Sequence, residues 1–174
     1  MLGMHCASWA ALALCAPAVA AGKDSGNRTV FGTTGLSPAA AGQTLAQAEK
    51  ALREPLQAEA APADAQACHY RRAASLPGVR YAVSQGVLTR VETRDARYAT
   101  TRSLHVGDTT ERVRKAYGKR LVSTPHPYFA KGLTMTIYAA DKRSALVMES
   151  NDEGRIITLR GGRVPEVTWL EACS

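Results

Sequence analysis

The chain has 174 residues, of which 45% are hydrophobic, and its 22 Lys and Arg against 15 Asp and Glu give a formal net charge of +7. A chain of this size buries enough surface for one domain or two small ones, so its stability requires no metal and no dense disulfide framework. The basic residues are scattered, with no run of five like charges, no zinc-finger spacing and no RNA-binding aromatic motif. A basic surface favours acidic partners such as anionic lipid head groups, acidic proteins or nucleic acid. The scattered pattern argues against nucleic acid, and it is more typical of solvated surface positions than of a binding patch.

Residues 1–20, MLGMHCASWAALALCAPAVA, contain no Asp, Glu, Lys or Arg and are almost wholly apolar or small from Ala7 onward. This composition predicts a signal peptide, and the small residues of Ala18-Val19-Ala20 place cleavage after Ala20, with Ala21 as the near alternative. A retained anchor is disfavoured because Pro17 interrupts a run shorter than the about 20 apolar residues of a transmembrane helix. We expect a periplasmic or secreted protein with no stable membrane span after cleavage.

The leader leaves two further alternatives open. It has no Lys or Arg before its apolar run, so the true start codon is open. Leu12-Ala13-Leu14-Cys15 resembles a lipobox, but the residue before an acylated cysteine is normally small and Leu14 is not. Lipidation is therefore the weaker alternative.

The cysteines that follow the leader predict a disulfide. Cleavage removes Cys6 and Cys15, so the mature chain keeps Cys68 and Cys173. In an oxidising compartment a lone even pair indicates one bridge. The two cysteines lie 105 residues apart, so the bridge closes a long loop and contributes about 4 to 5 kcal/mol in the chain-entropy model. The alternative is two unrelated buried thiols.

The first helix-plus-sheet unit is expected over residues 34–98. Before it, residues 21–33 are polar and glycine-rich and predict a flexible lead-in with a short strand near 29–31. Thr44 is placed to cap a helix in which Gln47 occupies the capping-box position. This helix carries one apolar stripe and therefore needs a surface to pack on.

Strands follow this helix in the sequence. Residues 57–67 are alanine-rich with a proline and predict a loop or a poorly specified helical turn, and after them the period of the pattern changes. Residues 79–84 alternate between apolar and other side chains, and residues 87–91 are rich in β-branched types. The turn at Gly86 between them predicts a β-hairpin.

The second helix-plus-sheet unit is expected over residues 99–174. A strand at 103–106 leads into a helix from Gly107 to Gly118, with Asp108 or Thr109 as its cap. After the loop STPHPYFAKG, strands are expected at residues 133–139, 145–150 and 155–160.

The two helices resemble each other in sequence. Aligning Gly42 with Gly107 also matches Thr44 with Thr109, Lys50 with Lys115 and Ala51 with Ala116. The order of helix, strand, turn and strand recurs as well, which predicts an internal duplication. Helices this short are marginal alone, so each must pack on antiparallel strands. The predicted fold class is α+β, with two tandem units, each a short helical segment packed on an antiparallel β-sheet.

The Gly-x-Thr start of the second helix, its Tyr117-Gly118 end and the strands after it resemble a known fold. It is shared by β-lactamase inhibitory protein and the small lipoprotein of the outer-membrane β-barrel assembly machinery. In that family a helical segment packs on an antiparallel sheet, and the inhibitory proteins carry two such units in tandem. The better match covers 106–159 and the weaker one 42–91. The resemblance implies a binding role and supplies no site residues.

This chain departs from that family in two respects. It has no proper lipobox, and Cys68 and Cys173 lie in different units, whereas the inhibitory proteins hold disulfides inside each unit. Its C-terminal half also resembles uncharacterised exported bacterial proteins that end in a pattern like PEVTWLEAC, residues 165–173.

The residue types that carry catalysis or metal binding do not form a known motif. His69, His105 and His126 show no helical i, i+4 spacing, so we expect no metal. A Gly-x-Ser-x-Gly elbow does not occur, and Cys68 beside His69 points to the opposite side of a strand. We therefore expect no cofactor and no enzymatic activity.

The loop at residues 126–132, HPYFAKG, is the predicted binding segment. Exposed aromatic side chains commonly anchor protein contacts, so Tyr128 and Phe129, with His126 and Lys131, are the candidate binding residues. The alternative is that the two aromatic residues close the end of the core. The expected function is an exported, non-catalytic binding or cell-envelope accessory protein whose partner is an envelope or extracellular protein. The alternative is a periplasmic hydrolase or peptidoglycan-modifying enzyme that uses histidine and carboxylates.

Overall fold

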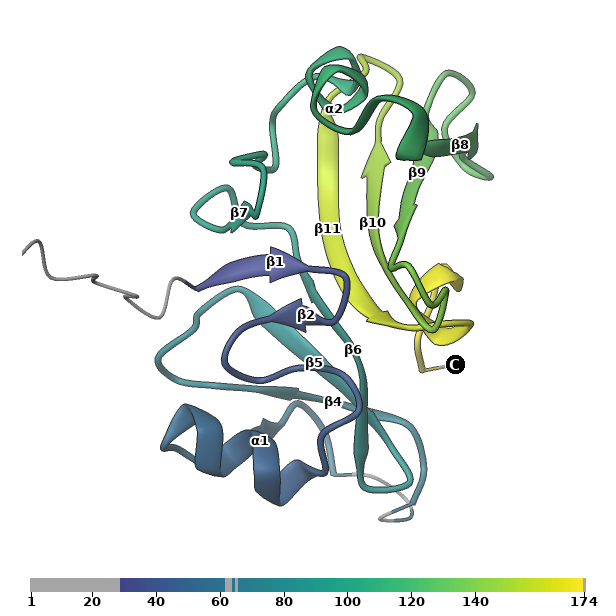
Figure 1. Cartoon of the computed structure of the whole chain (residues 1–174). Coiled ribbons are helices and arrows are strands. Elements are labelled where there is room, and N and C mark those ends of the chain that lie inside the picture. Colours follow the sequence, from purple (N-terminus) through teal and green to yellow (C-terminus); the bar gives the residue numbers. More distant parts are fainter. Residues whose placement is uncertain (1–28, 62–63, 65, 174) are drawn as a thin grey trace, which may run out of the picture.

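The computed structural model describes residues 29–61, 64 and 66–173, and it shows a mixed α+β protein dominated by one sheet (Figure 1). The main sheet has eight antiparallel strands in the order β3-β4-β5-β6-β11-β10-β9-β8, and β2-β1-β7 form a smaller sheet. The predicted signal peptide, residues 1–20, lies outside the described residues.

The main sheet consists of β3 (Gln57–Ala58), β4 (His69–Arg72), β5 (Val79–Ser84), β6 (Val87–Thr93), β8 (Val122–Pro125), β9 (Leu133–Tyr138), β10 (Ser144–Ser150) and β11 (Ile156–Arg163). The smaller sheet consists of β1 (Val30–Gly32), β2 (Gly35–Leu36) and β7 (Ala99–Thr100). The helices are α1 (Leu45–Leu52), α2 (Thr110–Tyr117) and the 3-10 helices η1 (Gly118–Arg120) and η2 (Glu166–Thr168). No helix in the described part of the chain is long and apolar enough to cross a membrane.

The sheet is ordered by halves of the chain. α1 precedes β3, β4, β5 and β6, and α2 precedes β8, β9, β10 and β11, so each half is a helix followed by four strands of the main sheet. The last strand of each half, β6 and β11, meet at the centre, where Arg160 lies opposite Glu92. The middle of the sheet therefore joins segments that are far apart in the sequence.

Both predicted helices begin at the threonines that the sequence indicates. Thr44 forms the full capping box with Gln47, and the Thr109 hydroxyl accepts a hydrogen bond from the Arg112 N–H. Thr109 rather than Asp108 is therefore the cap of α2. The backbone before each helix is bound to the last strand of its half, because Gly42 N–H donates to Leu88 and Gly107 N–H donates to Ile156, each at 2.7 Å.

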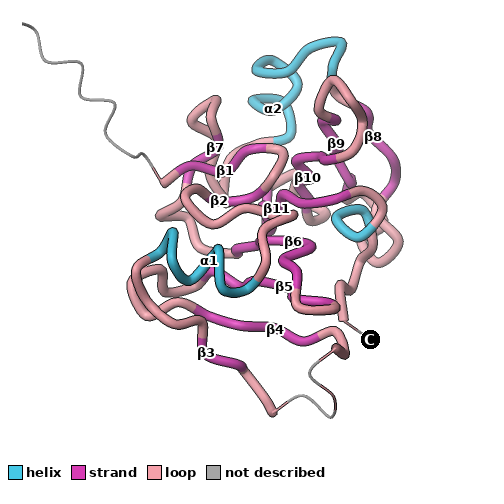
Figure 2. Tube along the Cα trace, turned by 60° about the horizontal axis from the view of Figure 1, so that its bottom comes forward, coloured by secondary structure: helices cyan, strands magenta, loops and turns pink. Residues whose placement is uncertain are grey.

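One face of the main sheet holds the hydrophobic core. Tyr81, Val91, Leu159, Met148 and Met135 are fully buried there, on five neighbouring strands. Ala48 of α1, Val113 of α2 and Phe31 of β1 pack into the same cluster. Because side chains alternate along a strand, the residues between these core positions lie on the other face. α1 and η2 lie on opposite sides of β6 in both views (Figure 2).

Two expectations from the sequence need correction, and a third is confirmed. A strand at 103–106 does not form, since Ser103 has a left-handed backbone, and only His105 makes an isolated bridge to Ala99. The short strand expected near 29–31 within the lead-in is confirmed, because residues 30–32 form β1 with Phe31 in the core. The expected loop at 123–132 contains most of β8, an edge strand that pairs with β9.

Candidate functional site

The face of the main sheet opposite the core carries a row of charged side chains. Arg80 on β5 lies opposite Glu92 on β6, and Glu92 lies opposite Arg160 on β11. In the sequence these residues alternate with the core positions, so the same pattern that builds the core also places charge on the opposite face. Three adjacent strands thus present arginine, glutamate and arginine side by side.

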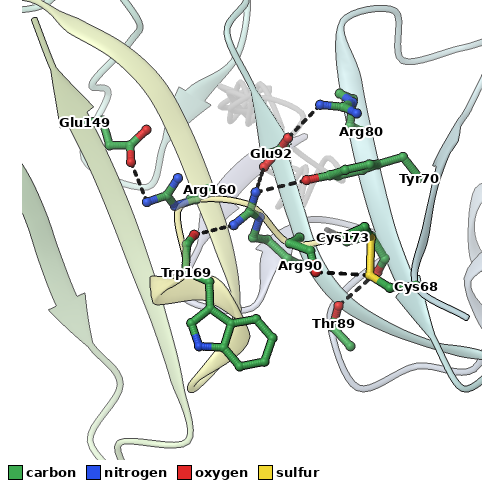
Figure 3. Close-up of polar contacts among 12 residues, drawn as sticks. Cys68, Tyr70, Arg80, Thr89, Arg90, Glu92, Glu149, Arg160, Trp169 and Cys173 are labelled. Carbon is green, nitrogen blue, oxygen red and sulfur yellow. Dashed lines mark hydrogen bonds and ion pairs between the residues drawn. A yellow bond between two sulfur atoms is a disulfide. The ribbon is translucent and has the colours of Figure 1, made fainter. Parts of the chain in front are cut away.

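The C-terminal segment lies against this charged face. Val167 of η2 is buried with Ala145 and Val147 in a second apolar cluster. Beyond η2, the Nη1 group of Arg90 donates to the Trp169 carbonyl oxygen at 2.6 Å (Figure 3). Apolar burial and a charge-assisted hydrogen bond therefore hold the segment after β11 onto the sheet.

The predicted disulfide between Cys68 and Cys173 is confirmed, and it fixes the end of this segment beside β4. Cys68 directly precedes β4, so the bridge joins the two halves of the chain across 105 residues. The bridge thereby makes the C-terminal segment part of the wall of the charged face.

A cavity of about 780 Å³ opens between the charged face, the C-terminal segment and the loop at 126–132. Its basic lining is Arg72, Arg80, Arg90, Arg94 and Arg160, and its acidic lining is Glu92, Glu149 and Glu171. Aromatic and apolar side chains complete the wall, namely Tyr70, Tyr128, Phe129, Ile157 and Leu170. Its volume lies in the range of small-molecule and peptide sites.

The arginines on the β4 side of the cavity are held by shared carboxylates. Glu92 accepts from Arg80 at 3.2 Å and pairs with Arg90 at 2.5 Å. The guanidinium of Arg80 stacks on the ring of Tyr70, with Arg80 Cζ 3.6 Å from the ring centroid. The hydroxyl of Tyr70 accepts a hydrogen bond from Arg90 at 3.0 Å. Glu59 also accepts from Arg80, at 2.8 Å. Burial alone would raise the pKa of Glu59, but the hydrogen bond and charge of Arg80 outweigh it and lower that pKa.

A second pair lies deeper in the cavity. Arg160 donates to Glu149 at 2.7 Å, and the two side chains are only 2% and 7% exposed. Burial lowers the pKa of Arg160, the negative charge of Glu149 opposes this effect, and the positive charge of Arg90 adds to it. Arg90 and Arg160 therefore repel each other in a poorly hydrated place, where charge interactions are stronger than in water.

Several polar atoms at this place lack a hydrogen-bond partner among the described residues. They are Arg90 Nε, Arg160 Nε and Thr158 Oγ1, and all three are buried. Buried polar groups are nearly always paired, so unpaired groups beside a cavity indicate a place for a bound molecule or for water.

The structure brings most of the predicted binding residues to the cavity. His126, Tyr128 and Phe129 line it, with Tyr128 76% exposed. Lys131 does not line it, and its backbone N–H instead donates to Asp152. Phe129 is partly buried and packs its ring on that of His126, and it belongs to neither apolar cluster of the described residues.

His126 is the histidine that the structure places beside a carboxylate. It is largely buried, and its Nδ1 accepts from the backbone N–H groups of Tyr128 and Phe129 at 3.1 and 3.3 Å. Its Nε2 lies 3.7 Å from Glu149 Oε1. His126 thus shapes the loop and also extends the Arg160–Glu149 pair.

The other predicted histidines lie elsewhere. His69 contacts the Ala67 carbonyl oxygen and Arg71, and His105 contacts the Ala96 carbonyl oxygen. No cluster of three or more His, Cys, Asp or Glu able to hold a metal ion occurs within residues 29–61, 64 and 66–173.

Sequence reasoning missed the arginines of the cavity. The signal was present in RVETR, residues 90–94, where Arg90, Glu92 and Arg94 alternate with Val91 and Thr93. A strand with one apolar and one charged face predicts a charged sheet surface. The partners of these arginines on β11 and β10 could not be read from the sequence, because they depend on strand order.

No known protein family matches the chain, and no curated protein matches it. A solved structure with a similar fold is an extracellular protein containing an SCP domain from Bacillus anthracis str. Ames. The TM-score is 0.50 and the sequence identity 9%, and the match covers 86% of this chain and 50% of the other. This chain therefore spans about half the length of that protein, and the likeness concerns the fold alone.

Proposed function

We propose that this chain is an exported, non-catalytic binding or cell-envelope accessory protein that holds an acidic protein partner against the charged face of its main sheet. The observation that carries the proposal is the cavity of about 780 Å³, in which five arginines face three glutamates. Such a surface attracts and orients acidic partners.

Exposed aromatic side chains at and beside the cavity support a protein partner. Tyr128 lines it and is 76% exposed, and Trp169, on the C-terminal segment, is 49% exposed. Large aromatic residues are enriched among those that dominate binding energy at protein interfaces. They offer apolar contacts next to the charged floor.

A periplasmic or secreted location is part of the same proposal. The leader-like residues 1–20 and the Cys68–Cys173 bridge support it, since disulfides persist mainly in oxidising compartments.

Equivalent contacts support the idea that the two halves are tandem related units of the inhibitory-protein kind, near the predicted bounds 34–98 and 99–174. Gly42 and Gly107 have φ values of 96° and 95°, and each donates to the second residue after a turn glycine, Gly86 or Gly154. Leu45 N–H donates to Gly86 and Thr110 N–H to Gly154, both at 2.9 Å. The match of the two helices in sequence thus extends to their backbone contacts.

An enzyme of the hydrolase or peptidoglycan-modifying type is the second candidate. The observation that favours it is the approach of His126 Nε2 to Glu149 inside the cavity, at 3.7 Å. A histidine beside a carboxylate is an arrangement used in acid–base catalysis. Against it, Glu149 Oε1 already accepts from Arg160, and both backbone contacts of His126 serve the loop.

The test compares two arginine variants in a capture experiment. Arg94 lines the cavity and has no hydrogen bond or ion pair to any described residue, so Arg94→Glu reverses a charge without breaking a contact. Arg114→Glu is the matched control, because Arg114 is exposed on α2, which packs on the core face. The tagged mature chain, residues 21–174, is incubated with envelope and secreted proteins.

We expect a partner that the parent chain and Arg114→Glu retain and Arg94→Glu loses. Retention of every partner by Arg94→Glu would exclude the cavity as the contact site. Peptidoglycan or ester hydrolysis that His126→Gln abolishes would favour the second candidate instead.

A further inference from the structure

We infer that the cavity binds an organic anion, with its acid group over Thr158 between Arg94 and Arg160 and its apolar body toward Tyr128 and Leu170. This inference rests on the proposed function, because it names the chemical group of the partner that the charged face receives. Specificity comes from charge and hydrogen bonds at the acid group, and the rest of the ligand makes apolar contacts.

The charges of the lining leave room for a negative group. Five arginines and three glutamates line the cavity. Glu59, which pairs with Arg72 and Arg80, adds a fourth carboxylate, so the formal excess is one positive charge. Glu92 is shared between Arg80 and Arg90, and Glu149 pairs with Arg160. Arg94 has no such partner among the described residues, so an incoming anion meets a guanidinium that is not already neutralised.

Strand pairing places the acid group. β6 pairs with β11 as far as Thr93, which lies opposite Leu159. Thr158 and Arg94 are the next residues at this end of the ladder, and both line the cavity. On its other side, Thr158 lies opposite Glu149 of β10. The hydroxyl of Thr158 is buried without a partner, and so is Arg160 Nε, two residues further along the same face. An acid group above Thr158 therefore lies beside this hydroxyl and both arginines, and the guanidinium of Arg94 is the exposed one.

Guanidinium groups and a hydroxyl recognise carboxylates and phosphates by the same chemistry. Each offers two or more oxygens that accept charge-assisted hydrogen bonds from arginine. Both groups therefore meet the same requirement, an oxyanion attached to an organic body. The titration below distinguishes a carboxylate from a phosphate ester.

The remaining wall of the cavity explains why an organic anion fits better than an inorganic one. Tyr128, Phe129, Ile157 and Leu170 line the same space as the arginines. Binding sites of this size combine an apolar wall with a few placed polar groups. A ligand with no carbon frame leaves this wall unused.

The test is calorimetric titration of the mature chain at low salt with four probes. They are 4-phenylbutyrate, phenyl phosphate, inorganic phosphate and the neutral 4-phenylbutanamide. We expect at least one of the two organic anions to bind at least tenfold more tightly than both inorganic phosphate and the amide. The tighter of the two identifies a carboxylate or a phosphate ester as the natural group.

Variants locate the site. Arg94→Ala and Thr158→Val are each expected to weaken the bound organic anion at least threefold, and Arg114→Ala to leave its affinity unchanged. Circular dichroism verifies the fold of each variant. Arg94 is exposed and has no hydrogen bond or ion pair to a described residue, so Arg94→Ala tests binding without an expected loss of stability.

The inference is overturned if neither organic anion binds, if the amide or inorganic phosphate binds as tightly, or if Arg94→Ala and Thr158→Val leave the affinity intact. Its failure is distinct from that of the proposed function. Capture of a protein that depends on Arg94, with no binding of the organic anions, would retain the function and reject this ligand. Binding of an organic anion that depends on Arg94 and Thr158, with no captured protein, would retain this ligand and reject the proposed protein partner.

Discussion

Arg90, on the central strand β6, donates a hydrogen bond of 2.6 Å to the backbone oxygen of Trp169, 79 residues later in the chain. The same guanidinium donates to Tyr70 and pairs with Glu92, so it connects the C-terminal segment to the floor of the cavity. Four residues beyond Trp169, Cys173 is bound to Cys68. The wall of the cavity thus has one covalent and one polar attachment.

Removal of the covalent attachment is expected to destabilise the protein. Cys173→Ser, with Cys68→Ser to avoid a free thiol, opens a loop of 105 residues. We expect the free energy of unfolding to fall by about 2 to 5 kcal/mol, because the unfolded chain regains the freedom that the bridge removed. Urea denaturation of the parent chain and the double variant measures the change. Equal midpoints, or two free thiols by intact mass in periplasmic material, would contradict the role given to this bridge.

The Arg160–Glu149 pair provides a second prediction, on buried charge. Arg160→Met leaves Glu149 without its cation in a site where the carboxylate is 7% exposed, so we expect a loss of roughly 3 to 5 kcal/mol. The double variant with Glu149→Gln is expected to lose less than the sum of the two single variants, because it removes both charges.

The control for this buried pair is a solvent-exposed ion pair. Arg163 pairs with Glu166 at 2.9 Å, but the arginine side chain is 47% exposed, so Arg163→Met is expected to change stability by less than about 1 kcal/mol. Urea denaturation of all four variants completes the comparison. Additive losses at Arg160 and Glu149 would show that the two charges do not depend on each other.

Local patterns in the sequence predicted the helices and most strands. Thr44 with Gln47 and Thr109 mark helix starts by side-chain chemistry that acts within four residues, and alternation marks β5 and β9 to β11. The even pair of cysteines predicted the bridge because compartment and count left few alternatives.

The cavity depended on information that local patterns lack. Arg90 and Arg160 are 70 residues apart and meet because β6 pairs with β11, the last strands of the two halves. β8 was hidden because its residues, Val122–Pro125, are polar or exposed and form an edge strand only by pairing with β9. The binding loop was found for its aromatic residues, whereas its charged counterpart required the strand order.

Acid is expected to weaken the turn after β6 through Asp95. Hydrogen bonds from Arg97 lower the pKa of Asp95 to about 2, below the value of about 3.9 for an unfolded aspartate. A carboxylate with a lowered pKa in the folded state stabilises the fold above the unfolded pKa. This contribution is lost as the pH falls through the range from about 4 to about 2.

The pKa of Asp95 is measured by following its side-chain carboxyl resonance by NMR from pH 6 to about pH 1, so that both sides of the expected midpoint are sampled. We expect a midpoint near 2 in the parent chain and an upward shift in Arg97→Gln, since the paired cation is the cause. Asp141 is the comparison carboxyl, because it accepts a hydrogen bond from the backbone N–H of Arg143 and has no ion pair among the described residues. An unchanged midpoint in Arg97→Gln would refute the assignment.

Gly161 is expected to be the most sensitive glycine of the central strand, because the β1–β2 hairpin crosses it. A Cβ at this position would lie 2.3 Å from the Gly32 carbonyl oxygen and 2.5 Å from the Gly35 nitrogen. Both are backbone atoms, so the hairpin must move away from β11. We expect Gly161→Ala to lower the free energy of unfolding by about 1 to 3 kcal/mol, the usual range for overpacking a close contact.

Gly32→Ala is the control, because no atom lies within 4 Å of a Cβ there. Thermal unfolding of the two variants decides the matter, and equal midpoints would show that the hairpin does not pack closely on the sheet.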